Sequence, residues 1–406
     1  MGTPQTPYDA VLHAARDVAK LDNALDAEML GAALLGSVYS VAETERDAAV
    51  RDFVAGFLAA TSRRRSAAAT TIRSVFAALV PDAEGAGRVR PGAATPAWAA
   101  QLGRVHLTGC WSYGDVYGDQ TSYLATFAYD DPAGGSAHAV VTLLDHNIGI
   151  TKDVFVGGPP DRILDQVRQM CSGDELTWFR DEEPARMRTE VTRHLAITDG
   201  LTELPGEGSL ATDRALLGAR LALLPRAAGV APAPAEPLSA AERTDLVRRF
   251  LASPEAARFG LDAIDGAELA SLHFCLSLLL DHAASFPDAD PMRWSPTVAG
   301  LFLLDWVHRR AVLDMDDAAL LPRVLRAWAG YAARKRGLPE QAATQTDTAI
   351  EEMVPEFARL YSTGERRSPA TAAVAQLMAD GVDPDDPAAL NAWIEANRHR
   401  LTDDPA

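Results

Sequence analysis

One segment of this chain, residues 104–156, alternates apolar and polar side chains, whereas the sequence on either side follows helical spacing. β-Branched and aromatic residues are frequent in two of its runs, 123–129 and 138–144, and runs of this composition with a period of two predict strands. Turn-forming residues follow the runs at 130–135 and 147–149. We therefore predict a small antiparallel β-meander, with one aromatic face in the core. That face comprises Tyr123, Ala125, Phe127 and Tyr129.

Helical spacing surrounds the meander, and 406 residues are enough for two domains. Apolar residues recur every three or four positions through 7–80, which predicts four helices, and again through 159–224, where helices would cover the sheet. The segment 225–238 is rich in proline. Because each proline removes a backbone hydrogen-bond donor, the segment cannot form an ordinary helix and is predicted to be a linker. The rest, 239–406, is helical only. The prediction is thus an α+β domain over 1–224, a linker and an all-α C-terminal domain.

Helix boundaries in the C-terminal part carry recognisable signals. Ser239 and Glu242 have the spacing of a capping box. A serine followed by proline predicts two further N-termini, at Ser295-Pro296 and Ser368-Pro369. A glycine predicts two C-termini, at Gly337 and Gly381.

The net charge of −18 argues against nucleic-acid binding, because phosphate neutralisation needs a basic face. Two basic clusters are exceptions, at 63–65 and 334–336. The second falls at the end of a predicted helix, where cations complement the helix dipole. We interpret both clusters as solvated side chains at helix ends. Association with nucleic acid through Arg63, Arg64 and Arg65 is therefore the least favoured hypothesis for function.

The cysteines and the apolar stretches bear on location. Cys110, Cys171 and Cys275 are odd in number and widely separated, so they form neither a disulfide framework nor a CxxC motif. The N-terminal segment lacks a basic stretch followed by an apolar run and is not predicted to be a signal peptide. The most apolar stretch, 274–280, ends at Asp281, short of the roughly 20 residues of a membrane span. We expect a cytoplasmic protein without a membrane partner.

Three stretches carry a resemblance: YGDQTSYLATFAYDD, HAVVTLLDHNIGITKDVFV, and WSPTVAGLFLLDWVHRR with VLRAWAGYAARKRGLP. They resemble an uncharacterised family of actinobacterial proteins that has no assigned activity. The resemblance implies a host group and brings no catalytic residues with it.

Motifs of the common enzyme classes are missing from the sequence, among them GxxxxGK, GxGxxG, HExxH and GxSxG. What remains is a group of polar residues around the predicted strands. Asp115 and Asp119 lie in one loop, and Asp145 and His146 lie at the end of a strand. Carboxylates with imidazole suit a divalent metal or acid–base catalysis. The sequence therefore gives a candidate metal site of Asp115, Asp119, Asp145 and His146, with no cofactor-binding motif and no assigned catalytic residue.

The same residues have a structural interpretation. If residues 148–149 form a two-residue turn, Asp145 lies across from Lys152 as a cross-strand ion pair, and His146 is a turn residue. Gly-Asp pairs are equally ordinary in turns. His138 precedes His146 by eight residues, about 26 Å along a continuous strand, so these two cannot share an ion.

Three hypotheses for function follow. The preferred one is a non-catalytic binding or interaction module that takes a protein partner or a small ligand, because catalytic motifs are missing and a helical module follows a linker. The alternative is a metal-dependent hydrolase that uses Asp145 and His146. Nucleic-acid association is the third.

Overall fold

The computed structural model describes residues 6–90, 92, 94–206, 208–227, 235–382 and 386–402. The chain divides into two compact units, unit 1 over residues 1–232 and unit 2 over residues 233–406. The division falls inside the predicted linker 225–238, of which residues 228–234 lie outside the described residues.

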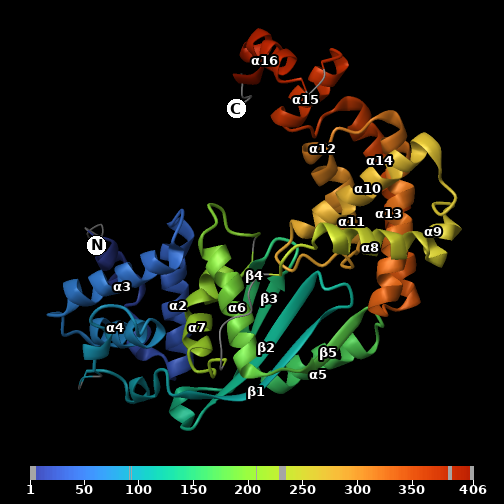
Figure 1. Cartoon of the computed structure of the whole chain (residues 1–406). Helices are drawn as coiled ribbons and strands as arrows, with labels where there is room; N and C mark the ends of the chain where they lie inside the picture. The colour runs from blue at the N-terminus through green and yellow to red at the C-terminus, as the bar shows by residue number, and fades with distance from the viewer. Residues whose placement is uncertain are drawn as a thin grey trace. The chain divides into compact units, whose positions relative to one another are not determined.

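Four α-helices open unit 1, as the spacing predicts: α1 (Pro7–Ala14), α2 (Ala24–Val41), α3 (Arg46–Thr61) and α4 (Ala67–Leu79). They are the blue helices of Figure 1. Side chains at the N-caps of α1, α2 and α4 accept a hydrogen bond from the first turn, which satisfies backbone donors that have no partner inside a helix.

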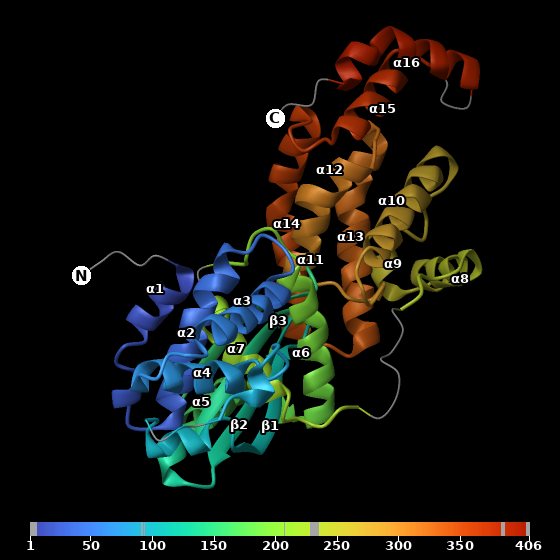
Figure 2. The ribbon, with the colours of Figure 1, turned by 90° about the vertical axis from the view of Figure 1, so that its left-hand side faces the viewer.

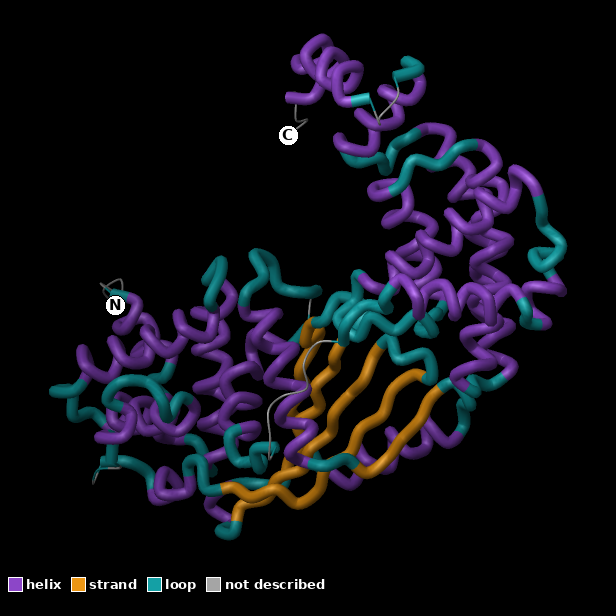
Figure 3. The backbone as a smooth tube through the Cα atoms, viewed as in Figure 1, coloured by secondary structure: helices purple, strands orange, loops and turns teal. Residues whose placement is uncertain are grey.

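The predicted meander of residues 104–156 supplies four strands of one antiparallel sheet, and a fifth strand outside it completes the sheet. Its order is β4-β3-β2-β1-β5, and Figure 3 shows the strands side by side. The strands are β1 (Val105–Asp115), β2 (Gln120–Tyr129), β3 (His138–Asp145), β4 (Ile150–Gly157) and β5 (Thr177–Asp181). The sequence did not predict β5, because it has five residues, lies between two helices and, as an edge strand, pairs only with β1.

One face of the sheet is the predicted aromatic face, and it lies in the main core of unit 1. Tyr123, Ala125 and Phe127 are buried there. Helices α6 (Pro184–Asp199) and α7 (Leu210–Leu221) pack on this face beside β4. In Figure 2 the blue N-terminal helices lie in front of the sheet. This side of the sheet therefore anchors most of the helices of unit 1.

The opposite face of the sheet has a smaller core of its own. Leu124 is fully buried and packs with Val167 and Cys171 of α5 (Pro160–Ser172), the helix that covers this face. The predicted helices of residues 159–224 thus cover the sheet from both sides.

Helix α2 has 18 residues and is, in the described part of the chain, the one helix long and apolar enough to cross a membrane by length and composition. The sequence prediction had singled out residues 274–280 instead. Half of α2 is buried inside unit 1, and an added Cβ at Gly36 would lie 2.5 Å from the carbonyl oxygen of Ala211. Because a side chain has no room there, glycine allows α2 and α7 to approach closely.

A polar network lies inside unit 1 where α2, α7, β2 and β3 meet. The Arg220 guanidinium pairs with the Glu28 carboxylate, and both side chains are 1% exposed. Arg220 Nε donates to His138 Nε2 at 3.0 Å. The Tyr129 hydroxyl and the Gly103 backbone N–H each donate to Glu28 at 2.7 Å. These groups satisfy one another, as buried charges require.

We expect the buried His138 to make the stability of unit 1 depend on pH. Burial, together with the Arg220 charge, lowers its pKa from 6.5 to about 4. Between these values the unfolded chain binds a proton that the folded chain does not, so the free energy of unfolding should decrease as pH falls from about 6.5 to about 4. We expect His138→Gln, which keeps an acceptor for Arg220, to reduce that decrease. Urea unfolding of both proteins at pH 7 and pH 5 measures it, and equal pH dependence would contradict the assignment.

In the described residues of unit 2 all the regular secondary structure is helical, and its helices run from yellow to red in Figure 1. Its core centres on Trp328, which is fully buried and packs against Phe250 and Tyr331. The helices are α8 (Ala240–Leu251), α9 (Pro254–Arg258), α10 (Gly266–Ala284), α11 (Pro296–Leu301), α12 (Val307–Arg310), α13 (Met315–Arg336), α14 (Glu340–Thr363), α15 (Pro369–Ala379) and α16 (Pro387–Thr402), with a π-helical turn, η5 (Phe302–Trp306), between α11 and α12.

The boundary signals of unit 2 are confirmed. Ser239 and Glu242 form a capping box at α8. Ser295 and Ser368 cap α11 and α15, each with proline at the first position. Gly337 ends α13 in the left-handed conformation, and Gly381 also has a positive φ of 72°. Local chemistry therefore sets these helix ends.

Helix α10 carries one buried histidine, His282, in an aromatic environment. Cys275 and His282 are buried, whereas His273 is exposed. Four aromatic rings surround the His282 imidazole at centroid distances of 5.0–5.8 Å. Burial lowers the His282 pKa to about 4, so this histidine is neutral near pH 7. The rings belong to Phe286, Trp294, Phe302 and Trp306.

Candidate functional site

Unit 1 contains a cavity of about 480 Å³. Its walls come from α2, α3, α6 and α7 and from the end of α4 with the residues that follow it. Apolar side chains line much of it, including Leu35, Val50, Leu79 and Leu195. Ligand sites in proteins are typically concave, mostly apolar and about 300–1,000 Å³ in volume. This cavity has the size and lining of such a site.

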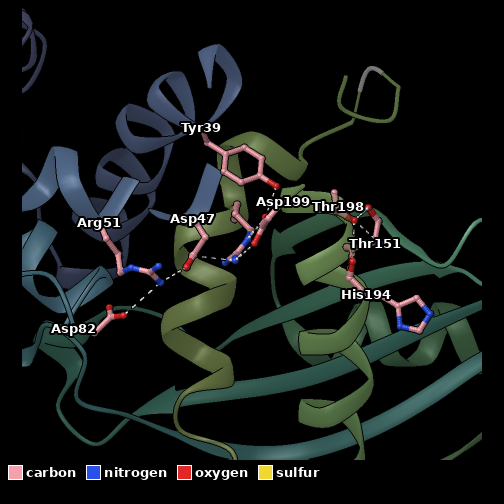
Figure 4. A network of polar contacts seen from close by, with 9 residues as sticks. Tyr39, Asp47, Arg51, Asp82, Thr151, His194, Thr198 and Asp199 are labelled. Atoms are coloured by element: carbon pink, nitrogen blue, oxygen red, sulfur yellow. Dashed lines mark hydrogen bonds and ion pairs between the residues drawn. The ribbon is translucent and has the colours of Figure 1, made fainter. Parts of the chain in front are cut away.

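A chain of polar contacts runs along one side of the cavity, as Figure 4 shows. The Tyr39 hydroxyl donates to Asp199 at 2.6 Å. Arg214 pairs with Asp199 at 2.7 Å and with Asp47 at 3.2 Å. Asp47 also pairs with Arg51, whose guanidinium lies 3.8 Å from Asp82; these residues all line the cavity. Acidic and basic groups therefore alternate, and each charge has a partner.

Burial and these contacts together set the protonation of Tyr39 and Arg214. Burial and the Asp199 charge raise the Tyr39 pKa well above its ordinary value of 10. Burial alone would lower the pKa of Arg214, but Asp199 and Asp47 outweigh it and raise that pKa. Tyr39 is therefore neutral and Arg214 charged at physiological pH. The hydroxyl is a hydrogen-bonding group here rather than a base.

Asp199 is held in place by the residue before it. The Thr198 hydroxyl lies 3.2 Å from the backbone oxygen of Thr151 and 3.0 Å from that of His194, either of which can accept its one proton, and it accepts from the Thr151 N–H at 2.9 Å. Figure 4 shows these contacts beside the polar chain. They tie the last turn of α6 to β4, so the sheet positions the Asp199 carboxylate.

Two more arginines line the cavity, apart from the polar chain described above. Arg188, on α6, and Arg226, after α7, both line it. Arg188 Nη1 donates to the backbone oxygens of Ala222, at 3.2 Å, and Leu224. Burial and the nearby Arg226 charge lower the Arg188 pKa. The Arg226 guanidinium is therefore close enough for its charge to act on Arg188.

The residues of the candidate metal site lie together at one end of the sheet, in the turns β1–β2 and β3–β4. The Asp115 carboxylate accepts three backbone N–H groups of residues 118–120 at 2.7–3.0 Å. The His146 N–H donates to the Asp119 backbone oxygen at 2.9 Å, which joins the two turns. The two turns are therefore neighbours in the structure. The Asp115 carboxylate stabilises the conformation of its own loop.

Asp145 and His146 also bond within the sheet. Asp145 accepts from the Asn147 N–H at 3.0 Å and lies 3.8 Å from the Lys152 amine. The ion pair of the structural interpretation thus forms, although the register differs: Asp145 pairs with Ile150 across a longer turn, and the ladder shifts after Leu143. His146 Nε2 lies 2.9 Å from the Thr121 hydroxyl.

In the residues that the structure describes, no group of three or more His, Cys, Asp or Glu side chains is arranged to hold a metal ion. The imidazoles of His146 and His194 are neighbours, with centroids 5.2 Å apart. The predicted site residues are therefore near one another without forming an evident ligand shell.

The cysteines are poor candidates for nucleophiles. All three are free and buried. Burial raises the pKa of Cys110 and of Cys275 to about 12. Since the thiolate is the reactive form, neither thiol is activated.

The cavity was not predicted from the sequence. Its lining spans residues 35–226, and no short motif contains more than a few of them. The cavity residues that stand out in the sequence are charged residues on amphipathic helices. Such residues ordinarily lie on the surface and do not indicate a cavity. Comparison with protein-family models, with curated proteins and with solved structures finds no match for the chain.

Proposed function

We propose that this chain is a non-catalytic binding protein and that the unit 1 cavity takes a small organic ligand. The observation that supports this most directly is the cavity itself, about 480 Å³ of mostly apolar space with a few fixed polar groups. Such a site supports the small-ligand form of the binding hypothesis rather than the protein-partner form.

The chemistry of the lining favours binding over catalysis. Asp47 and Asp199 are paired with arginines, and Tyr39 keeps its proton. General bases and nucleophiles need accessible groups with pKa values near the working pH. The paired carboxylates and the neutral phenol instead suit orientation of a bound molecule. A cytoplasmic location belongs to the same proposal, since all three cysteines are free thiols.

Filling the cavity tests the proposal. Ala196 lines the cavity from α6 and is exposed, so a larger side chain can enter the space without disturbing the core. We expect a thermal-shift screen against metabolites to find compounds that stabilise the wild-type chain but not Ala196→Trp. A ligand at 100 times its Kd adds about 2.7 kcal/mol to the folded state.

Ala60→Trp is the matched control, because Ala60 is an exposed helical alanine outside the cavity. It should keep the shifts of the wild type. Shifts that persist in Ala196→Trp would place binding elsewhere and contradict the proposal. Divalent metals belong in the same screen: a metal-dependent shift that Asp145→Ala or His146→Ala abolishes would instead favour the hydrolase.

A further inference from the structure

We infer that the ligand of the unit 1 cavity carries an anionic group, a carboxylate, sulfonate or phosphate, bound by Arg188 and Arg226, with an apolar body along the cavity. The inference rests on the proposed function, because it names the ligand class of that same site. Geometry, charge and hydrogen-bonding capacity each support it.

The two polar parts of the cavity are well separated. On α6, Arg188 and Asp199 are 11 residues apart, which is about 16 Å along a helix at 1.5 Å per residue. On α7, Arg214 lies near the start, beside Asp199, whereas Ala222 follows the last residue, beside Arg188. The helices therefore run in opposite directions along the cavity, with the Tyr39 end and the Arg188 end far apart.

The charges at the two ends differ. At the Tyr39 end, Arg214 is neutralised by Asp199 and Asp47. At the other end, no carboxylate of the described residues lies within ion-pair distance of Arg188 or Arg226, although each is a cavity residue. Arg188 is half-buried and Arg226 is exposed, and both line the same cavity. Two like charges on one cavity favour a bound anion, which relieves their repulsion.

Arg188 has donors left for that anion. Its bonds to the two backbone oxygens at the end of α7 use Nη1, and a guanidinium has five N–H donors in a fixed fork. Nε and Nη2 can therefore bind a carboxylate or phosphate in the two-bond geometry that arginine prefers. The backbone contacts hold the side chain in place, which reduces the entropy lost on binding.

The space between the two ends suits an apolar body. Leu35, Leu79, Val80, Leu195 and Leu221 line the cavity and leave few polar partners for the middle of a ligand. An organic anion would gain from burying apolar surface there and from the charge at one end. Inorganic phosphate would gain only the interaction with the charged end, without burial of apolar surface, and should bind much more weakly.

Two fluorescent probes separate the contributions of charge and apolar surface. Anilinonaphthalenesulfonate carries a sulfonate, and phenylnaphthylamine has the same aromatic body without it. We expect the full-length chain to bind the sulfonate more tightly, and Arg226→Gln to weaken only the sulfonate, by about tenfold or more, the loss of one charge-assisted hydrogen bond. Arg188→Gln should act in the same direction.

Arg162→Gln is the control, because Arg162 is exposed on α5, on the other face of the sheet. Circular dichroism of each variant verifies the fold. If both probes bind equally, lose affinity in Ala196→Trp and ignore Arg226→Gln, the cavity binds ligands but the anionic preference is wrong. If neither probe responds to Ala196→Trp, the proposed function itself fails.

Discussion

Replacing Arg220 with methionine should lower the free energy of unfolding of unit 1 by about 3–5 kcal/mol, because the change strands the Glu28 carboxylate in the core. The pair is 1% exposed, so water cannot take over the role of the guanidinium. His138 Nε2 would lose its donor as well. Unfolding in urea can be monitored by hydrogen exchange of peptides from unit 1. This measures the stability loss of unit 1 separately from the stability of unit 2.

The double variant Glu28→Gln with Arg220→Met shows whether charge is the cause. A neutral glutamine still accepts from the Gly103 N–H, and no unpaired charge is buried. We expect it to be clearly more stable than Arg220→Met alone, with a coupling energy of the kind that double-mutant cycles report. Equal stability of the two variants would show that packing, rather than the stranded charge, explains the loss.

Trp328→Ala should cost unit 2 about 3–5 kcal/mol, the usual range for removing a large aromatic side chain from a core. Trp328 is fully buried, its ring centroid is 4.9 Å from that of Phe250, and its indole N–H donates to the Pro291 oxygen at 3.1 Å. Trp393 of α16 is partly exposed, and Trp393→Ala should cost much less. Hydrogen exchange of peptides from α10 and α13 gives both values, and similar losses would contradict the central position of Trp328.

The fold was largely predictable because it is encoded locally. Periodicity gave the helices of 7–80 and the strands of 104–156, and caps such as Ser239 gave helix ends. What failed was short or non-local. Strand β5 has too few residues to show a period. The Asp145–Lys152 ion pair forms, but the two-residue turn from which it was predicted does not, because Ile150 lies opposite Asp145.

The candidate site was much less predictable. Each of Asp47, Arg188 and Arg214 is, in sequence, an ordinary charged residue on a helix. Only tertiary packing brings α2, α3, α6 and α7 together around one space. By contrast, Asp145 and His146 could be picked out from the sequence because they are adjacent in it. Adjacency in sequence does not indicate whether residues line a cavity. Sequence patterns therefore favoured the end of the sheet over the cavity.

The buried pair of Glu28 and Arg220 joins residues 192 positions apart, which affects how the protein is made. At about 5–20 residues per second, a ribosome synthesises Arg220 roughly 10–40 s after Glu28. Throughout that time the apolar surface of α2 that α7 will cover has no native partner. The nascent chain therefore exposes the α7-facing surface of this apolar helix until α7 emerges, and during synthesis that surface of α2 is the one that a chaperone would need to shield.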